Sequence, residues 1–361
     1  MPLQVFSNSN AENWLSWLFR KKDQFHSITF YFLSQINATS PRFFPLYEQT
    51  KNLRIVVFRG LRMPKTDRAI LWFVNLFVLL FAKKINRYRY FVDHGFKYTK
   101  RLKTNLIIQL DDPTFKDEEI YRLRKLGENN SKHKEVRIVV TSEQIRGRLI
   151  DSGVTSPIKV IGQGYTESLA NSEIAKFTKF SMVYSSNYIH YKKDKHDSHP
   201  NWGVSEFIDT LMPSILSELS EVEIHMVGEL GPNAKRVLTK YDRVITHGRV
   251  DTLTNADILR RCHIGLYPRK HDNGWRVQKI YDYLGARLPI IAFKLEDTRL
   301  VSELGIGILV NTNKEFIEAI KLLVNDKNRY REIVGVASSV RAKYNWTAIA
   351  EQFDGLLLAE K

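Results

Sequence analysis

Residues 263–293, HIGLYPRKHDNGWRVQKIYDYLGARLPIIAF, contain two short apolar runs separated by a polar loop and a helical pattern. The two runs, Ile264–Tyr267 and Pro289–Phe293, have the length and β-rich composition of buried parallel strands. Between them, Val277 to Ala286 predicts a helix whose apolar residues fall on one face. Strand, loop, helix and strand in this order form a βαβ unit, so this stretch predicts a parallel α/β sheet.

The loop at 268–276 is basic. It carries Arg269, Lys270 and Arg276, and Lys279 follows within the first turn of the predicted helix. Ligands of open α/β sheets lie outside the carboxyl ends of the strands, where helix N-termini point free N–H groups at anions. The loop therefore predicts a phosphate site, and the alternative is a solvated basic loop on an ordinary α/β domain.

The same alternation of strand and helix runs through most of the chain, and it favours doubly wound parallel sheets. A helix is expected at Val204–Leu219 despite Pro213, and the segment Gly228–Gly231 is expected to be a loop. The other expected strands are Ser27–Leu33, Leu53–Phe58, Tyr90–Val92, Asn105–Leu110, Val136–Val140, Ile158–Ile161, Phe180–Tyr184, Val222–Val227 and Val244–His247.

The chain has 361 residues, which exceeds the size at which a single core stops growing, so two domains are expected. The polar segment 166–177 follows a predicted strand and marks the boundary. We expect an N-terminal domain at residues 1–170, a C-terminal domain at 171–345, and a helix at 346–361 that packs back on the first domain.

Charge is distributed unevenly along the chain. Residues 51–100 hold 12 Lys and Arg against 2 Asp and Glu, a local charge of +10 within a total of +16. Such a segment favours an anionic partner: a phospholipid headgroup, a phosphorylated lipid acceptor or nucleic acid. The single cysteine, Cys262, excludes an internal disulfide framework and is consistent with a reducing cytoplasm.

Two stretches resemble segments of the group 1 (family 4-like) GT-B glycosyltransferases. The first follows the pattern K-x-x-E-Y-x-x-x-x-x-P-[VI]-[VI] through Lys279, Asp282, Tyr283, Pro289, Ile290 and Ile291. The second is the run 136–165. Along it, a predicted strand is followed by Ser-Glu, a helix, Gly-Val and a strand that leads into Gly-Tyr. The resemblance covers residues 136–358 and implies a GT-B fold, two Rossmann-like doubly wound domains facing a central cleft, with a nucleotide-sugar donor in the second.

The resemblance also implies roles for residues of the donor site. Asp282 would accept hydrogen bonds from the nucleotide ribose, and Lys279 and Arg269 would stabilise the leaving diphosphate. The further donor-site candidates are Arg276, Tyr283, Gly228 and Glu229, although the Gly228–Gly231 segment could equally be a simple tight turn. The sequence departs from the family at Gly274, where retaining members carry Glu, and at Trp202-Gly203, where Lys-Gly is expected.

The catalytic candidates of the first domain are Asp93, His94 and Asp111. These polar residues follow two predicted strands, so they are expected at the carboxyl edge of the first sheet. Asp or His can take a proton from an acceptor hydroxyl in an inverting enzyme, and in retaining relatives a His here contacts the donor sugar. The alternative is that Asp93 and Asp112 cap the helices that follow.

We expect no metal and no bound cofactor, because enzymes of the resembled fold generally need no metal for catalysis. His190, His196 and His199 lie in one loop with Lys and Asp, but the spacing is a weak metal signal and a solvated loop is favoured.

The N-terminal half contains two stretches that favour contact with an anionic membrane surface. The apolar helix predicted at Ala69–Ala82 is too short to span a bilayer, which needs about 20 residues. It is either a buried core helix or, with Lys83 and Lys84 after it, an interfacial anchor. The stretch Trp14–Lys22 has a similar composition. No secretory signal is recognised, so we expect a cytoplasmic protein with peripheral contact at the inner membrane face.

These observations predict a glycosyltransferase that moves a sugar from a UDP- or GDP-sugar to a hydroxyl of a glycan, a glycolipid or a lipid-linked sugar. One alternative is a nucleic-acid-binding protein that uses the basic face, although no nucleic-acid motif is present. The other is a catalytically inactive GT-B scaffold, suggested by Gly274 and Trp202.

Overall fold

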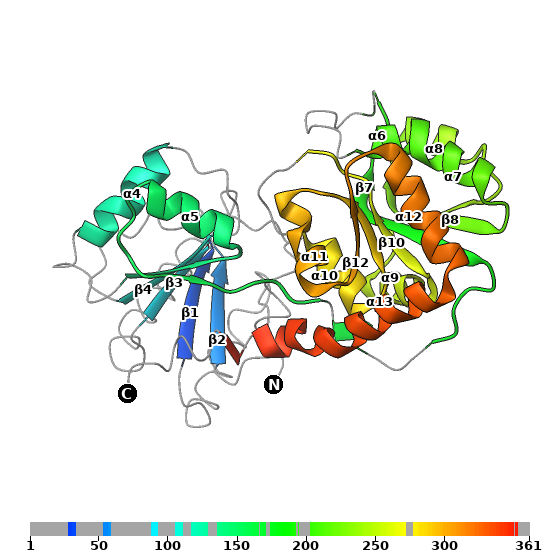
Figure 1. Cartoon of the computed structure of the whole chain (residues 1–361). Helices are drawn as coiled ribbons and strands as arrows, with labels where there is room; N and C mark the ends of the chain where they lie inside the picture. Colours follow the sequence, from blue (N-terminus) through cyan, green and yellow to red (C-terminus); the bar gives the residue numbers. More distant parts are fainter. Residues whose placement is uncertain are drawn as a thin grey trace, which may run out of the picture. The chain divides into compact units, whose positions relative to one another are not determined.

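The computed structural model describes residues 28–33, 53–58, 88–92, 105–110, 117–128, 136–165, 167–170, 174–192, 194, 203–271, 277–349 and 351–352. The chain divides into two compact units, Met1–Gly162 with Ile349–Lys361, and Gln163–Ala348 (Figure 1). Each unit is described by itself below.

The first unit contains a six-stranded parallel sheet in the order β2-β1-β3-β4-β5-β6. The helix α5 begins after Ser142, whose hydroxyl accepts a hydrogen bond from the Ile145 N–H at 3.2 Å. The bounds are β1 Ile28–Leu33, β2 Leu53–Phe58, β3 Tyr88–Val92, β4 Asn105–Leu110, α4 Asp117–Glu128, β5 Val136–Val140, α5 Glu143–Asp151 and β6 Ile158–Val160.

The second unit contains another six-stranded parallel sheet, in the order β12-β11-β10-β7-β8-β9. Its strands are β7 Phe180–Ile189, β8 Val222–Leu230, β9 Val244–Gly248, β10 Ile264–Tyr267, β11 Ile290–Phe293 and β12 Gly307–Val310. The strand order reverses between β7 and β10, and such a switch point is where open α/β sheets bind ligands.

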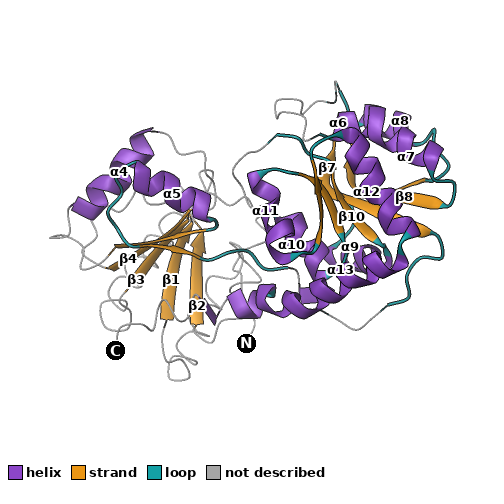
Figure 2. Cartoon of the chain, in the orientation of Figure 1, coloured by secondary structure: helices purple, strands orange, loops and turns teal. Residues whose placement is uncertain are grey.

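Helices cover both faces of this second sheet (Figure 2). Their bounds are α6 Val204–Glu206, α7 Met212–Glu218, α8 Pro232–Leu238, α9 Thr252–Arg261, α10 Gln278–Gly285, α11 Arg299–Leu304, α12 Asn313–Asn325 and α13 Lys327–Val340. The short helical turns are η3 Glu167–Leu169, η4 Phe207–Leu211, η5 Glu296–Thr298 and η6 Arg341–Tyr344. No helix in the described part of the chain is long and apolar enough to cross a bilayer.

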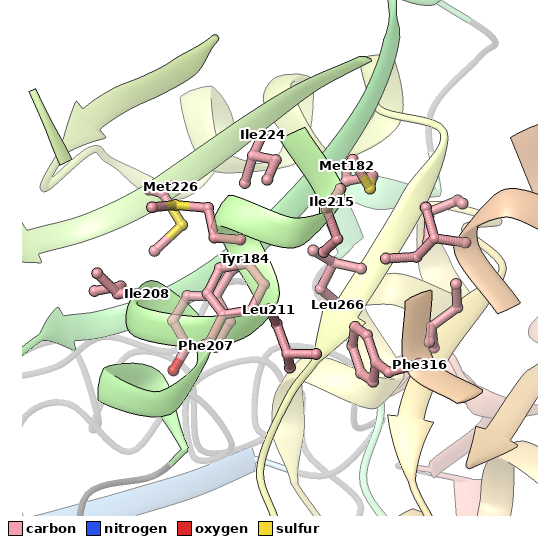
Figure 3. Close-up of a cluster of buried hydrophobic side chains, with 14 of the residues drawn as sticks. Met182, Tyr184, Phe207, Ile208, Leu211, Ile215, Ile224, Met226, Leu266 and Phe316 are labelled. Atoms are coloured by element: carbon pink, nitrogen blue, oxygen red, sulfur yellow. The ribbon is translucent and has the colours of Figure 1, made fainter. Parts of the chain in front are cut away.

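Side chains of the central strands alternate between two hydrophobic cores, one on each face of the second sheet. On β7, Met182 and Tyr184 belong to one core and Val183 to the other, as the two-residue period of a strand requires. The first core is closed by Phe207 and Phe316, and it is shown in Figure 3. The neighbouring strand β10 is buried on both faces and apolar throughout, which is why this run could be recognised in the sequence.

The βαβ unit at 263–293 is confirmed, with the strands β10 and β11 and the helix α10 between them. The strands predicted at Leu53–Phe58, Asn105–Leu110 and Val136–Val140 have the predicted bounds. The predicted helix at Ala69–Ala82 and the stretch Trp14–Lys22 lie outside the described residues, as does most of the helix predicted from 346 onward.

Two strands of the second sheet are longer than predicted. β7 continues to Ile189 and β8 to Leu230, so the expectation of a loop at Gly228–Gly231 is wrong for its first three residues. Gly228 explains why the strand continues. It adopts φ +145°, and a Cβ on it would lie 2.1 Å from the Ser186 carbonyl oxygen, so only glycine fits there. The pairing shifts register between Ser185 and Tyr188, so a glycine here permits an irregularity within the strand rather than ending it.

The helix predicted at Val204–Leu219 is present but irregular. A π-helical turn, η4, joins α6 to α7 just before Pro213, which occupies the first turn of α7. Proline has no N–H to donate within a helix, and a wider turn accommodates the missing hydrogen bond.

Candidate functional site

The first turn of α10 lies at the carboxyl edge of the second sheet, after β10. Its N-cap residue, Val277, has extended backbone angles and makes no side-chain capping hydrogen bond. The first N–H groups of a helix have no carbonyl one turn before them and carry its positive dipole end, although in α10 the Ile280 N–H donates to the Val277 carbonyl oxygen at 3.1 Å. The edge therefore offers backbone donors to an anion at the strand-order reversal between β7 and β10.

Gln278 ties this turn to the start of the second unit. Its Nε2 donates to the Gly164 carbonyl oxygen at 2.7 Å and to Asp282 Oδ1 at 3.2 Å. Its Oε1 is buried and accepts no hydrogen bond from any described residue. The Gln278 side chain thus holds the Asp282 carboxylate and leaves one buried acceptor unused.

Lys279 is half-buried, and its ammonium lies against two aromatic rings. Nζ is 4.4 Å from the ring centroid of Tyr184 on β7 and 5.6 Å from that of Tyr267 on β10. Burial, together with the positive charge of Arg269, lowers the pKa of Lys279 to about 7. Burial raises the pKa of Tyr184 to about 12 and raises that of Tyr267, so both rings stay neutral and offer only their π faces.

Arg269 occupies a buried ion pair behind Lys279. Only 3% of Arg269 and 4% of Asp297 are exposed. Arg269 Nη1 lies 3.6 Å from Asp297 Oδ2 and donates to Tyr267 Oη at 3.4 Å. The guanidinium, predicted to contact a diphosphate directly, therefore has an acidic partner inside the unit and acts on Lys279 as a neighbouring charge.

Gly203 brings the helical segment α6–α7 onto this part of the edge. It adopts φ +78°, and a Cβ on it would lie 2.3 Å from the Pro268 carbonyl oxygen and 2.9 Å from Arg269 Cα. Only glycine fits both the left-handed backbone and this close approach. The glycine of the predicted Trp202-Gly203 pair thus has a packing role, whereas Trp202 lies outside the described residues.

Two other lysines at this edge also have acidic partners. Lys270 forms an ion pair with Glu206, which also accepts from Asn313 Nδ2 at 3.1 Å, and the lysine lowers the pKa of that carboxyl. Lys192 Nζ lies 3.0 Å from Asp209 Oδ2. Lys279, in contrast, forms no ion pair with any carboxylate among the described residues, so no described acidic side chain competes with a ligand for it.

Asp282 lies three residues after Lys279 on α10, half-buried, where the sequence predicts a ribose contact. Tyr283 is buried completely. Its hydroxyl accepts from the Ser185 N–H at 3.1 Å and lies 3.2 Å from the Leu266 carbonyl oxygen. Tyr283 therefore fastens α10 to β7 and β10 from within the core of the second unit, and its assignment to the donor site stays a prediction.

Gly228 and Glu229 are part of β8. Glu229 is exposed and lies 3.8 Å from Arg249 Nη1. The next helix, α8, is capped by Asp194, whose carboxylate accepts from the N–H groups of Asn233 at 2.8 Å and Ala234 at 3.2 Å. Although burial opposes it, these backbone donors hold the pKa of Asp194 below its usual range. An acidic side chain thus occupies the anion position of α8.

Several predicted residues lie outside the described part of the chain: Arg276, Asp93, His94, Asp111, His196 and His199. Among the described residues, no group of three His, Cys, Asp or Glu side chains could hold a metal ion.

Four residues of the site were missed in the sequence: Tyr184, Tyr267, Gln278 and Asp297. Tyr184 and Tyr267 each stand near the carboxyl end of a predicted apolar run, and that position was their available signal. Asp297 comes from a separate segment and has no local signal that links it to Arg269.

Neither the protein-family models nor the curated protein sequences include a match to this chain. Solved structures do match. Alr3699/HepE of Anabaena, in complex with UDP-glucose, has a TM-score of 0.60 at 14% identity over 92% of this chain and 99% of that one. WaaG, a glycosyltransferase involved in lipopolysaccharide biosynthesis, has a TM-score of 0.58 at 9% identity over the same shares, 92% and 99%.

A third similar structure is a putative UDP-N-acetylglucosamine 2-epimerase from Listeria monocytogenes. Its TM-score is 0.57 at 13% identity, over 91% of this chain and 95% of that one. At such identities the similarity establishes the fold. The chain has the GT-B fold, with two Rossmann-like doubly wound α/β units, as the sequence predicted.

Proposed function

We propose that this protein is a glycosyltransferase that moves a sugar from a nucleotide-diphosphate donor to a hydroxyl acceptor. Among structures of the same fold, WaaG is described as a glycosyltransferase, and Alr3699/HepE was solved with UDP-glucose. Fold alone does not assign a reaction, so the proposal rests on the residues at the edge of the second sheet.

The observation that carries the proposal is the pairing of Lys279 and Asp282 on the uncapped α10. They lie three residues apart, so they share one side of the helix. An ammonium that pairs with no described carboxylate, at a helix N-terminus, suits a diphosphate, and a carboxylate one turn further along suits ribose hydroxyls. A nucleoside diphosphate carries both groups in one molecule.

In this reaction the bond between the sugar and the diphosphate breaks, and negative charge remains on the departing phosphate. Lys279 and the N–H groups of α10 would stabilise that charge. The buried Arg269–Asp297 pair would hold Tyr267, and through it the surroundings of Lys279, in place.

We further propose that the first unit binds the acceptor, a glycan, a glycolipid or a lipid-linked sugar. Its excess of positive charge at residues 51–100 suits a phosphorylated acceptor or an anionic membrane surface. Asp93, His94 and Asp111 are the residues that we propose for catalysis.

A second candidate function is isomerisation of a nucleotide sugar at the same site. It is favoured by the similarity to the putative Listeria epimerase. The two reactions differ in products: an epimerase changes the sugar while it stays on the nucleotide, and a transferase releases the nucleoside diphosphate. NMR of UDP-N-acetylglucosamine incubated with the protein, followed by assay of free UDP with candidate acceptors, separates them.

The test of the donor site is thermal unfolding with UDP, GDP, CMP, ADP and their common sugar conjugates. A ligand at 100 times its Kd stabilises the native state by about 2.7 kcal/mol, which raises the midpoint measurably. We expect one diphosphonucleoside series to raise it, and Asp282→Ala to abolish the effect. If none raises the midpoint, the proposed function is wrong.

The matched control is Glu318→Ala, which removes an exposed carboxylate from α12, where its described partner is Lys321. This variant should keep the full ligand-induced shift. Equal loss in both variants would mean that the Asp282 result reflects general damage to the protein and not ribose binding.

A further inference from the structure

Burial and the positive charge of Arg269 disfavour the charged form of Lys279, although the π faces of Tyr184 and Tyr267 attract an ammonium. Tyr184 approaches from β7, Tyr267 from β10 and Arg269 from the segment after β10. On its own helix the nearest polar side chains in sequence are Gln278 and Asp282, and Asp282 is engaged by Gln278. None of the described groups forms an ion pair with the Lys279 ammonium.

We propose that Lys279 takes up a proton when a nucleotide-diphosphate donor binds, so that the site holds its donor tightly only while this side chain is an ammonium. The inference rests on the proposed function and adds a regulation to it: donor affinity depends on pH through one residue.

The physical reason is that a bound diphosphate would change the charge next to the Lys279 amine. Without a ligand, burial and the Arg269 charge hold the pKa of Lys279 near 7, so a large share of the molecules carries a neutral amine at neutral pH. A bound diphosphate brings negative charge to the amine, which favours the ammonium and raises its pKa. Thermodynamic linkage then requires that binding takes up a proton.

The other described basic residues at this edge do not share this behaviour. Lys192 is paired with Asp209 and Lys270 with Glu206. Arg269 is a guanidinium, which keeps its proton at all ordinary pH values. Among these four cations, therefore, only Lys279 forms no ion pair with a carboxylate of the described residues.

The first experiment measures donor affinity against pH. The probe is UDP-glucose, with GDP-mannose and ADP-glucose used if the base differs. The diphosphate is esterified at both ends, so the probe has no group that titrates between about pH 6 and pH 8.5. We expect Kd to rise about tenfold per pH unit above about pH 7, because each unit lowers the ammonium fraction tenfold.

The decisive variant is Lys279→Arg, which keeps a positive charge throughout this range. Its Kd should change by less than about threefold over the same interval, whatever its absolute value, since a guanidinium does not titrate there. Lys235→Arg, at an exposed position on α8, is the matched control and should keep the wild-type pH dependence.

A second measurement counts the proton directly. Calorimetric titration of the probe at about pH 8, in buffers of different ionisation enthalpy, should show uptake of close to one proton by the wild type. Lys279→Arg should show close to none.

The possible failures are distinguishable. Absence of binding at every pH, for all three probes, would overturn the proposed function and this inference with it. Binding that is equally tight at about pH 6 and pH 8.5, or a pH dependence that persists in Lys279→Arg, would overturn only the proton coupling.

Discussion

The phenol of Tyr283 shows how one residue of a functional motif can serve the fold. Its ring packs over Gly265, where a Cβ would lie 2.5 Å from a ring carbon, and its hydroxyl bonds to the backbone of β7. The same helix presents Lys279 and Asp282 to the edge of the sheet. Tyr283 therefore sets the position of α10, while its neighbours supply the contacts that we propose for the donor.

Tyr283→Phe tests this division of roles. It leaves the Ser185 N–H without its buried acceptor, so the free energy of unfolding should fall by about 1–3 kcal/mol. Urea denaturation measures this loss. Sugar-nucleotide affinity, measured below the unfolding transition, should change by less than about threefold.

The opposite result, a steep loss of sugar-nucleotide affinity with an unchanged free energy of unfolding, would show that Tyr283 itself contributes to donor binding.

At the scale of the elements, the long strands β7 and β8 depend on one glycine. Gly228 has φ +145° beside the Ser186 carbonyl, whereas Gly248, at the end of β9, has φ +66° with no atom within 4 Å of its Cβ position. Both glycines have a positive φ, but only Gly228 has atoms close to the position of a Cβ. Comparing them separates backbone strain from steric exclusion.

Gly228→Ala should destabilise the protein by more than Gly248→Ala does. At Gly248 the cost is that of a left-handed residue, about 1–2 kcal/mol, and at Gly228 the displacement of the Ser186 backbone adds to the strain. Thermal unfolding midpoints of the two variants and the wild type provide the measurement. Equal midpoints in the two variants would show that displacing the Ser186 backbone adds nothing to the loss of stability.

At the scale of the whole molecule, a histidine pair makes stability depend on pH. His225 on β8 and His247 on β9 are joined by a hydrogen bond of 2.9 Å, and Phe177 stacks on His225 at 4.4 Å. Burial, and the neighbouring His247, lower the pKa of His225 to about 4. In an unfolded chain a histidine has a pKa of about 6.5.

Between these two values the unfolded chain binds a proton that the folded state excludes. The free energy of unfolding should therefore fall as pH is lowered from about 6.5 to about 4, by about 1.4 kcal/mol per pH unit for this residue. Urea denaturation at several pH values should show a shallower dependence in His225→Gln. His271→Gln, at an exposed position, should keep the wild-type slope, and a similar slope in all three proteins would contradict the assignment.

The amino-acid sequence by itself determined the parallel strands and the position of α10. A strand buried on both faces must be apolar over its whole length, so runs such as Ile264–Tyr267 and Ile290–Phe293 could be located without any tertiary information. The basic loop after β10 and the spacing of Lys279 and Asp282 were likewise visible, because helix and strand periods are local properties of the chain.

The tertiary structure alone decided which charges remain available to a ligand. Arg269 and Asp297 lie 28 positions apart, and Lys270 and Glu206 lie 64 apart, so no local pattern reveals either pair. Burial of Tyr283 and the proximity of Tyr184 to Lys279 likewise arise only when β7 and β10 lie side by side. Ion pairing and desolvation depend on distances in space, and the order of residues in a sequence does not contain those distances.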